Sequence, residues 1–202
     1  MDLFPEDYST ELKRYMSKLK VVDNAIGILL DGLEERGILD DTVIVLFGDH
    51  YPYSMDTEKI NAALDYDLSV DNNGDRISLI IYNSEISAQE IDAYTSYIDI
   101  LPTVANLFNL NYDSRLYMGT DALSQEHEDM VIFIDGSWKN EYAFYNASTS
   151  EIHYYTQKTY SREEILAINT EVRLKLEMSG LAIRRNYFSY LEDALSNYTT
   201  SE

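Results

Sequence analysis

Cysteine is absent from this sequence, and its absence excludes several kinds of chemistry. A chain without thiols has no disulfide bond, no thiolate metal ligand and no cysteine nucleophile, while the redox compartment stays open. Long apolar runs are absent too, because no stretch approaches the roughly 20 apolar residues that a membrane-spanning helix requires. The first residues, Met1–Glu6, also lack the basic and apolar regions of a signal peptide. We therefore expect a soluble chain without a membrane segment.

Basic residues are scarce in the sequence. Lysine and arginine total 15 against 36 aspartates and glutamates, which gives a formal net charge of −21. Such a charge repels nucleic acid and anionic membrane surfaces, and it favours the binding of cations. Glycine and proline are also few, with eight and three residues, whereas apolar residues make up 45% of the chain. This composition is typical of a folded domain with a sizeable core, and we expect no nucleic-acid partner.

The N-terminal part of the sequence predicts one long amphipathic helix. Apolar residues recur every three or four positions across residues 9–36. Ser9 or Thr10 can cap the start of this helix, and Gly37 can end it.

Two apolar runs follow the helix, at residues 42–47 and 77–82, and both read as strands. A fully apolar strand next to a helix indicates a parallel-type sheet that is covered on both faces. The segment between these strands, residues 51–76, is polar and reads as irregular, with a turn at Asp71–Gly74.

The C-terminal half predicts further helices and a hairpin. The expected elements are a helix at 99–110 with Asp99 as its N-cap and Pro102 in its first turn, a strand at 130–134, a hairpin of 142–145 with 152–155, a helix that begins at the capping box 161–164 and is broken by Gly180, and a last helix carrying Ile183, Tyr187, Leu191 and Leu195.

The most informative motif is Gly48-Asp49-His50, directly after the first predicted strand. Open α/β folds bind ligands in the crevice outside the carboxyl ends of their strands. A carboxylate and an imidazole at such a place are suited to a divalent metal such as Mn or Zn. The same pair can also do no more than cap a turn, and its spacing alone does not separate these readings.

Several motifs occur together in a fixed order along the chain. They are Val22–Gly27 on the first helix, Gly37–Tyr51 around the strand and the Gly-Asp-His triplet, Ile98–Thr103, Tyr117–Ser124 and Glu126–Asp129. In this order they resemble the extracellular catalytic domain of lipoteichoic acid synthases and related phosphoglycerol transferases. These enzymes are sulfatase-like members of the alkaline phosphatase superfamily. The resemblance covers about residues 10–137, more than half of the chain.

The resemblance implies a fold and a domain organisation. Residues 1–137 are expected to form the C-terminal portion of a sulfatase-like catalytic domain, an α/β/α sandwich whose central sheet has helices on both faces. Residues 138–202 are expected to form a small subdomain, a β-hairpin with helices that packs on it.

The resemblance also implies a chemistry. In this family a threonine beside a divalent metal, usually Mn, attacks the phosphodiester of phosphatidylglycerol and passes glycerol phosphate to a growing polymer at the extracellular face of the bacterial membrane. Asp49 and His50 match metal ligands of the family. Gly48 is expected to ease the bend that brings both side chains to one ion.

The nucleophile, the remaining acidic ligand and the substrate-binding histidine lie upstream of the first matching helix in the family. We therefore expect this chain to be the C-terminal portion of a longer enzyme that supplies two metal ligands and no catalytic residue. Such a chain is expected to be inactive alone.

Other polar residues are weaker candidates. His127 lies in an acidic run that reads as a solvated loop, and His153 alternates with tyrosines on a predicted strand, where a structural role is expected. Thr103 and Thr120 belong to family motifs but not to its nucleophile position, so neither receives a catalytic role. Three aspartates after the site loop, Asp56, Asp65 and Asp67, could approach a substrate.

Two other functions stay open. The chain could be a non-catalytic, sulfatase-like binding or interaction module, with the hairpin 142–155 and the helices 161–197 as its working surface. It could also belong to a related sulfatase or phosphoethanolamine transferase, because the residues that would decide this lie upstream in the family.

Overall fold

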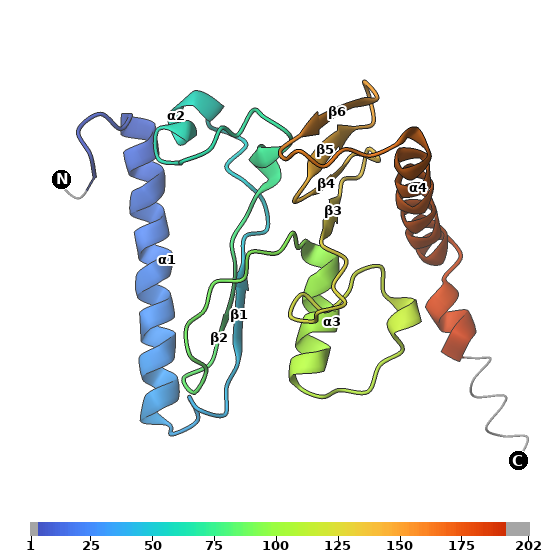
Figure 1. Cartoon of the computed structure of the whole chain (residues 1–202). Helices are drawn as coiled ribbons and strands as arrows, with labels where there is room; N and C mark the ends of the chain where they lie inside the picture. The colour runs from blue at the N-terminus through green and yellow to red at the C-terminus, as the bar shows by residue number, and fades with distance from the viewer. Residues whose placement is uncertain (1–3, 193–202) are drawn as a thin grey trace, which may run out of the picture. The chain divides into compact units, whose positions relative to one another are not determined.

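A computed structural model describes residues 4–192 and divides into two units between Gln89 and Glu90 (Figure 1). Helices and two small antiparallel sheets alternate along the chain, which confirms the α/β class of a partial sulfatase-like fold. The domain boundary expected at residue 137 stays a prediction. Within residues 4–192, no helix combines the length and the apolar composition that crossing a membrane demands.

Helix α1, Thr10–Glu35, is the first element of the N-terminal unit, and both of its expected ends are confirmed. The Ser9 hydroxyl accepts a hydrogen bond from the Leu12 N–H at 3.1 Å, as an N-cap does. At the other end the Gly37 N–H donates to the Glu34 carbonyl at 2.8 Å, and the Ile38 N–H donates to the Leu33 carbonyl at 3.1 Å. This double closure is a Schellman motif, and it needs a residue in the left-handed region after the helix.

Gly37 fills that left-handed position, with φ at +67°. Replacing it by alanine is expected to lower the free energy of unfolding by about 1 kcal/mol, because a Cβ disfavours this backbone conformation. Gly27→Ala inside α1 is the matched control, since a Cβ there meets no atom within 4 Å. It should raise stability by about 0.5–1 kcal/mol. Urea unfolding measures the change in unfolding free energy for both variants. If both changes had the same sign, the left-handed assignment of Gly37 would be wrong.

Strands β1, Ile44–Phe47, and β2, Leu79–Tyr82, lie where the sequence predicts strands, but they pair antiparallel. The expected parallel arrangement is therefore wrong for this pair. The expected cover on both faces is wrong as well, because Phe47 is 49% and Ile80 is 53% exposed. An apolar run predicts a strand, but it encodes neither the direction of the neighbouring strand nor how far both faces are covered. The antiparallel register sets Phe47 opposite Leu79, so the chain leaving β1 runs beside the start of β2.

The core of the N-terminal unit gathers around the short helix α2, Thr57–Asn61, in a segment that was expected to be irregular. Four buried residues form this core, Leu12 from α1 together with Met55, Ile60 and Leu68. Lys59 joins α2 to α1, with its Nζ 2.7 Å from Glu11 and 2.9 Å from Asp56. The hydrogen bond to Glu11, then that to Asp56, raise the pKa of Lys59 above its ordinary value.

The C-terminal unit begins with helix α3, Tyr97–Leu107, which starts two residues earlier than expected. Its N-cap is Ser96, so the prediction that Asp99 is the N-cap is wrong. Asp99 is the third helical residue, and its Oδ2 accepts a hydrogen bond from the Ser96 N–H at 2.8 Å, as in a capping box. Pro102 consequently lies beyond the first turn.

A four-stranded antiparallel sheet follows in the order β3-β4-β5-β6. Its strands are β3 Met130–Ile132, β4 Trp138–Asn140, β5 Ala143–Asn146 and β6 Glu151–Tyr154. The pairing of β5 with β6 confirms the predicted hairpin. Its turn is closed by the Asn146 side chain, which accepts hydrogen bonds from the N–H groups of Ser148 and Thr149.

Helix α4, Arg162–Arg184, packs on this sheet (Figure 1). Its capping box is confirmed: Ser161 N–H donates to Glu164 at 2.7 Å, and Glu164 N–H donates to the Ser161 hydroxyl at 3.2 Å. The prediction that Gly180 breaks the helix is wrong, because one glycine costs an interior turn only about 1 kcal/mol. The helix ends instead before Asn186, whose φ is +50°. Residues 187–192 are helical again, and the predicted Leu195 lies outside the described residues.

Candidate metal site

The chain leaves β1 through Gly48, Asp49 and His50, beside the start of β2. Gly48 does not adopt a positive φ. A Cβ at this position would lie 3.4 Å from the Ile77 side chain, which is an ordinary contact. The expectation that the bend depends on the conformational freedom of Gly48 is therefore wrong.

Asp49 and His50 present one oxygen and one nitrogen close together. The Asp49 Oδ1 lies 3.6 Å from the His50 Nε2, and the two side chains are 88% and 52% exposed. Two ligands that share one ion, each at about 2.1 Å, stand about 3–3.5 Å apart in tetrahedral or octahedral geometry. The separation therefore fits two ligands of one divalent ion after a small side-chain rotation.

Neighbouring aspartates do not complete the site in the described part of the chain. Among residues 4–192, no three histidine, aspartate or glutamate side chains gather closely enough to hold a metal. Asp56 pairs with Lys59, and Asp65 is exposed. Asp67 accepts hydrogen bonds from Ser69 and Asn61, and these bonds, those from Ser69 first, hold its pKa below the ordinary value. The two donors at Asp49 and His50 thus fit part of a metal site.

Sequence reasoning missed two tyrosines that lie against His50. The His50 Nδ1 lies 2.7 Å from the Tyr51 carbonyl oxygen. The Tyr53 ring centroid lies 4.7 Å from that of the imidazole, at an interplanar angle of 48°. The sequence Tyr51-Pro52-Tyr53, two aromatic residues around a proline directly after a candidate ligand, is the signal that could have shown them.

Comparison with known proteins decides the family of the chain. The family model described as Sulfatase matches residues 3–110, which is more than half of the 202 residues and includes the Gly48-Asp49-His50 triplet. The chain belongs to the sulfatase family.

Its similar relatives include lipoteichoic acid synthases. Lipoteichoic acid synthase 2 of Bacillus subtilis is 25% identical over 191 residues, 88% of this chain and 28% of the relative. Lipoteichoic acid synthase of Staphylococcus saprophyticus is 29% identical over 157 residues, 70% of this chain and 24% of the relative. The enzyme of that name from Staphylococcus aureus (strain USA300) is 25% identical over 198 residues, 89% of this chain and 28% of the relative. The chain thus spans about a quarter of the length of these curated relatives.

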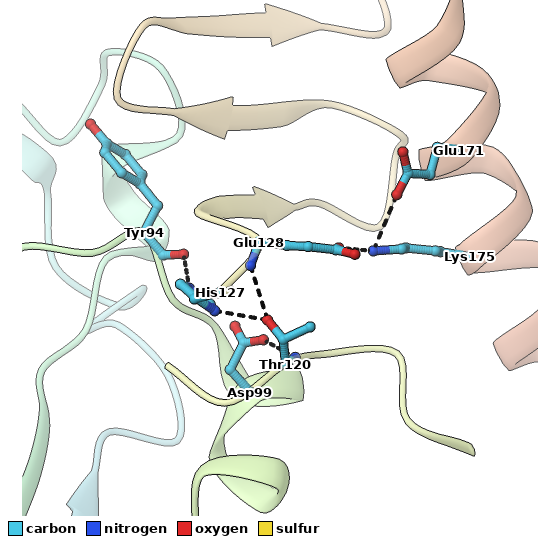
Figure 2. Close-up of polar contacts among 7 residues, drawn as sticks. All are labelled: Tyr94, Asp99, Thr120, His127, Glu128, Glu171 and Lys175. Carbon is cyan, nitrogen blue, oxygen red and sulfur yellow. Dashed lines mark hydrogen bonds and ion pairs between the residues drawn. The ribbon is translucent and has the colours of Figure 1, made fainter. Parts of the chain in front are cut away.

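A second polar cluster surrounds His127 in this sulfatase-family chain (Figure 2). His127 is half-buried, so the expectation of a simply solvated position is wrong for this residue. Its Nδ1 lies 2.8 Å from the Thr120 hydroxyl, and its Nε2 lies 3.2 Å from the Tyr94 carbonyl. The carbonyl can only accept, so Nε2 carries the proton, and Nδ1 accepts from the hydroxyl. The imidazole therefore links two segments of the chain.

The remaining contacts of this cluster are structural. The Asp99 Oδ1 accepts a hydrogen bond from the Thr120 N–H at 2.9 Å, and Glu128 forms an ion pair with Lys175 on α4 (Figure 2). The buried Thr103 hydroxyl donates to the Asp99 carbonyl at 2.6 Å and accepts from the Ala122 N–H at 2.9 Å. That neither Thr103 nor Thr120 is catalytic stays a prediction. His153 lies on β6, with its ring 5.3 Å from that of Tyr155.

Proposed function

We propose that this chain is the C-terminal part of the catalytic domain of a metal-dependent phosphoglycerol transferase. The observation that carries the proposal is the pair of donors at Asp49 and His50, 3.6 Å apart within the segment that the sulfatase family matches. The similarity to lipoteichoic acid synthases supports phosphatidylglycerol as the donor and a glycerol-phosphate polymer as the acceptor, at the extracellular face of a bacterial membrane.

In this proposal Asp49 and His50 are two ligands of a divalent metal, with Mn as the first choice. A carboxylate oxygen and an imidazole nitrogen suit that ion. When bound, such an ion polarises a phosphoryl oxygen and lowers the pKa of a nucleophile. The proposal places the nucleophile and the other ligands in a segment upstream of helix α1, as the resemblance to the phosphoglycerol transferases implies. The chain alone is then expected to show no turnover.

Thermal unfolding of the chain across a Mn titration tests the metal site. Binding to the folded state alone stabilises it by about 1.4 kcal/mol at a Mn concentration ten times Kd, which raises Tm by about 3–5 °C in a chain of this size. Asp49→Ala and His50→Ala should both abolish this rise. His153→Ala is the matched control, because it removes an exposed imidazole on β6. This variant should keep the rise in Tm with Mn.

A second experiment tests the reaction itself. In the complete gene product that contains residues 1–202, His50→Ala is expected to lower glycerol-phosphate transfer from phosphatidylglycerol by at least about 100-fold, because the metal loses a ligand. Full activity in both the His50→Ala and the Asp49→Ala proteins would refute the proposal. Turnover by the 202-residue chain alone would refute its assignment of the nucleophile to another part of the protein.

A further inference from the structure

The backbone carbonyl of Tyr51 accepts two hydrogen bonds. One comes from the His50 Nδ1 at 2.7 Å, and the other comes from the Tyr53 N–H at 2.8 Å. A carbonyl oxygen has no hydrogen to give, so the proton of a neutral His50 imidazole lies on Nδ1. The lone pair then lies on Nε2, the nitrogen that stands 3.6 Å from the Asp49 carboxylate.

This carbonyl belongs to a tight turn that is anchored in the core. The bond from the Tyr53 N–H closes a three-residue turn around Pro52, and the ring of proline restricts φ to the range that such a turn uses. The Pro52 carbonyl accepts a further hydrogen bond from the Met55 N–H at 3.0 Å. Met55 is buried with Leu12 and other residues of the N-terminal core. The position of the Tyr51 carbonyl is thereby tied to the hydrophobic core.

The Tyr53 ring lies against the imidazole from outside. The centroid of the Tyr53 ring is 4.7 Å from that of the His50 ring. The Tyr51 ring meets the Tyr53 ring edge-on, with the centroids 5.9 Å apart. Tyr53 is 67% exposed, so burial of its ring in the core does not account for this position. The His50 side chain is itself 52% exposed, and the Tyr53 ring lies against one side of it.

We propose that the turn Tyr51–Tyr53 positions His50 for metal binding before any ion arrives. The Tyr51 carbonyl fixes the proton on Nδ1, and the Tyr53 ring holds the imidazole with Nε2 beside Asp49. Tyr53 is then a positioning residue that acts through His50. The inference rests on the proposed function, because it assumes that Asp49 and His50 bind the ion.

Nuclear magnetic resonance of the chain labelled with ¹⁵N-histidine tests this inference. The sequence has three histidines, and single His→Gln substitutions assign their signals. In its neutral form, His50 should show the Nδ1–H tautomer. Paramagnetic broadening by added Mn²⁺ should affect the ring protons of His50 and spare those of His127 and His153. Asp49→Ala should weaken this broadening.

The Tyr53 variants decide the outcome. Tyr53→Ala is expected to mix the two tautomers of His50 and to require about three-fold more Mn²⁺ for the same broadening, in line with the energy of one exposed ring contact. Tyr53→Phe keeps the ring and should behave as the wild type, which a general loss of folding would not restore. The inference is overturned if Tyr53→Ala changes neither readout, if Tyr53→Phe behaves like Tyr53→Ala, or if His50 carries its proton on Nε2. The proposed function fails separately, and the inference with it, if Mn²⁺ broadens His50 no more than His153 in the wild type.

Discussion

Replacing Trp138 by alanine is expected to lower the free energy of unfolding of the C-terminal unit by about 3–5 kcal/mol. The indole is fully buried, with 0% exposure, between the sheet and α4. It stacks on the Tyr145 ring at 5.6 Å and meets the Tyr160 ring edge-on at 5.8 Å. Its N–H donates to the Asn169 side chain on α4 at 2.8 Å. Alanine would leave a cavity among these rings and deprive Asn169 of its donor.

Urea unfolding followed by circular dichroism measures this loss. Trp138 is the single tryptophan of the chain, so its fluorescence in the wild type identifies the transition that belongs to this unit. Trp138→Phe retains most of the apolar area and loses the N–H, and it should cost about 1–2 kcal/mol. Leu166→Ala on the exposed side of α4 is the control and should stay within about 0.5 kcal/mol. A loss below 1 kcal/mol for Trp138→Ala would contradict this description of the core.

The elements that the sequence predicted correctly have signals within a few residues of one another. Ser161 and Glu164 stand three positions apart and reveal the start of α4 by themselves. Gly37 marks the end of α1 because the left-handed residue follows directly after the helix. The hairpin of β5 and β6 is visible from the turn residues between its strands. Each of these features depends on local backbone chemistry.

The elements that it missed depend on residues that are distant in the chain. The antiparallel pairing of β1 with β2 joins Phe47 to Leu79, and the apolar character of either strand is the same for both directions. His127 is half-buried because it reaches the Tyr94 carbonyl, 33 positions away. The interior of α4 tolerates Gly180 because packing of the helix on the sheet outweighs one weak helix former.

The candidate metal site also has features that the local sequence shows and features that only the folded chain shows. Asp49 and His50 are adjacent in sequence and follow a strand, so their residue types and their place make them candidate ligands. Tyr53 is harder to find, because its contact with His50 depends on the turn around Pro52, and the Tyr-Pro-Tyr sequence is the one local signal of that turn. The remaining ligands of a complete site are a tertiary feature that two neighbouring residues cannot reveal.

Gly119→Ala is expected to lower the free energy of unfolding of the C-terminal unit by about 3 kcal/mol, through a backbone clash. A Cβ at this position would lie 2.4 Å from the carbonyl carbon and oxygen of Ile98 and 2.5 Å from the Asp99 Oδ1. Pro102 has no N–H to donate to the Ile98 carbonyl, and the chain at Gly119 approaches α3 at this place. The site therefore requires a residue without a side chain, although its φ is not positive.

The clash cannot be relieved by a side-chain rotation alone. Asp99 is buried, at 3% exposure, and its two oxygens accept hydrogen bonds from the Ser96 and Thr120 N–H groups. Moving Oδ1 away would break the bond to Thr120 and leave a buried carboxylate short of one donor, so the variant loses either packing or this bond. Urea unfolding gives the size of the loss, and faster amide hydrogen exchange at Thr120 would locate it. Gly180→Ala is the matched control in the same unit, because there the Cβ meets only the flexible end of the Arg184 side chain, and stability should stay equal or rise. If Gly119→Ala were as stable as Gly180→Ala, the segment after Tyr117 could not pack against α3 at this distance.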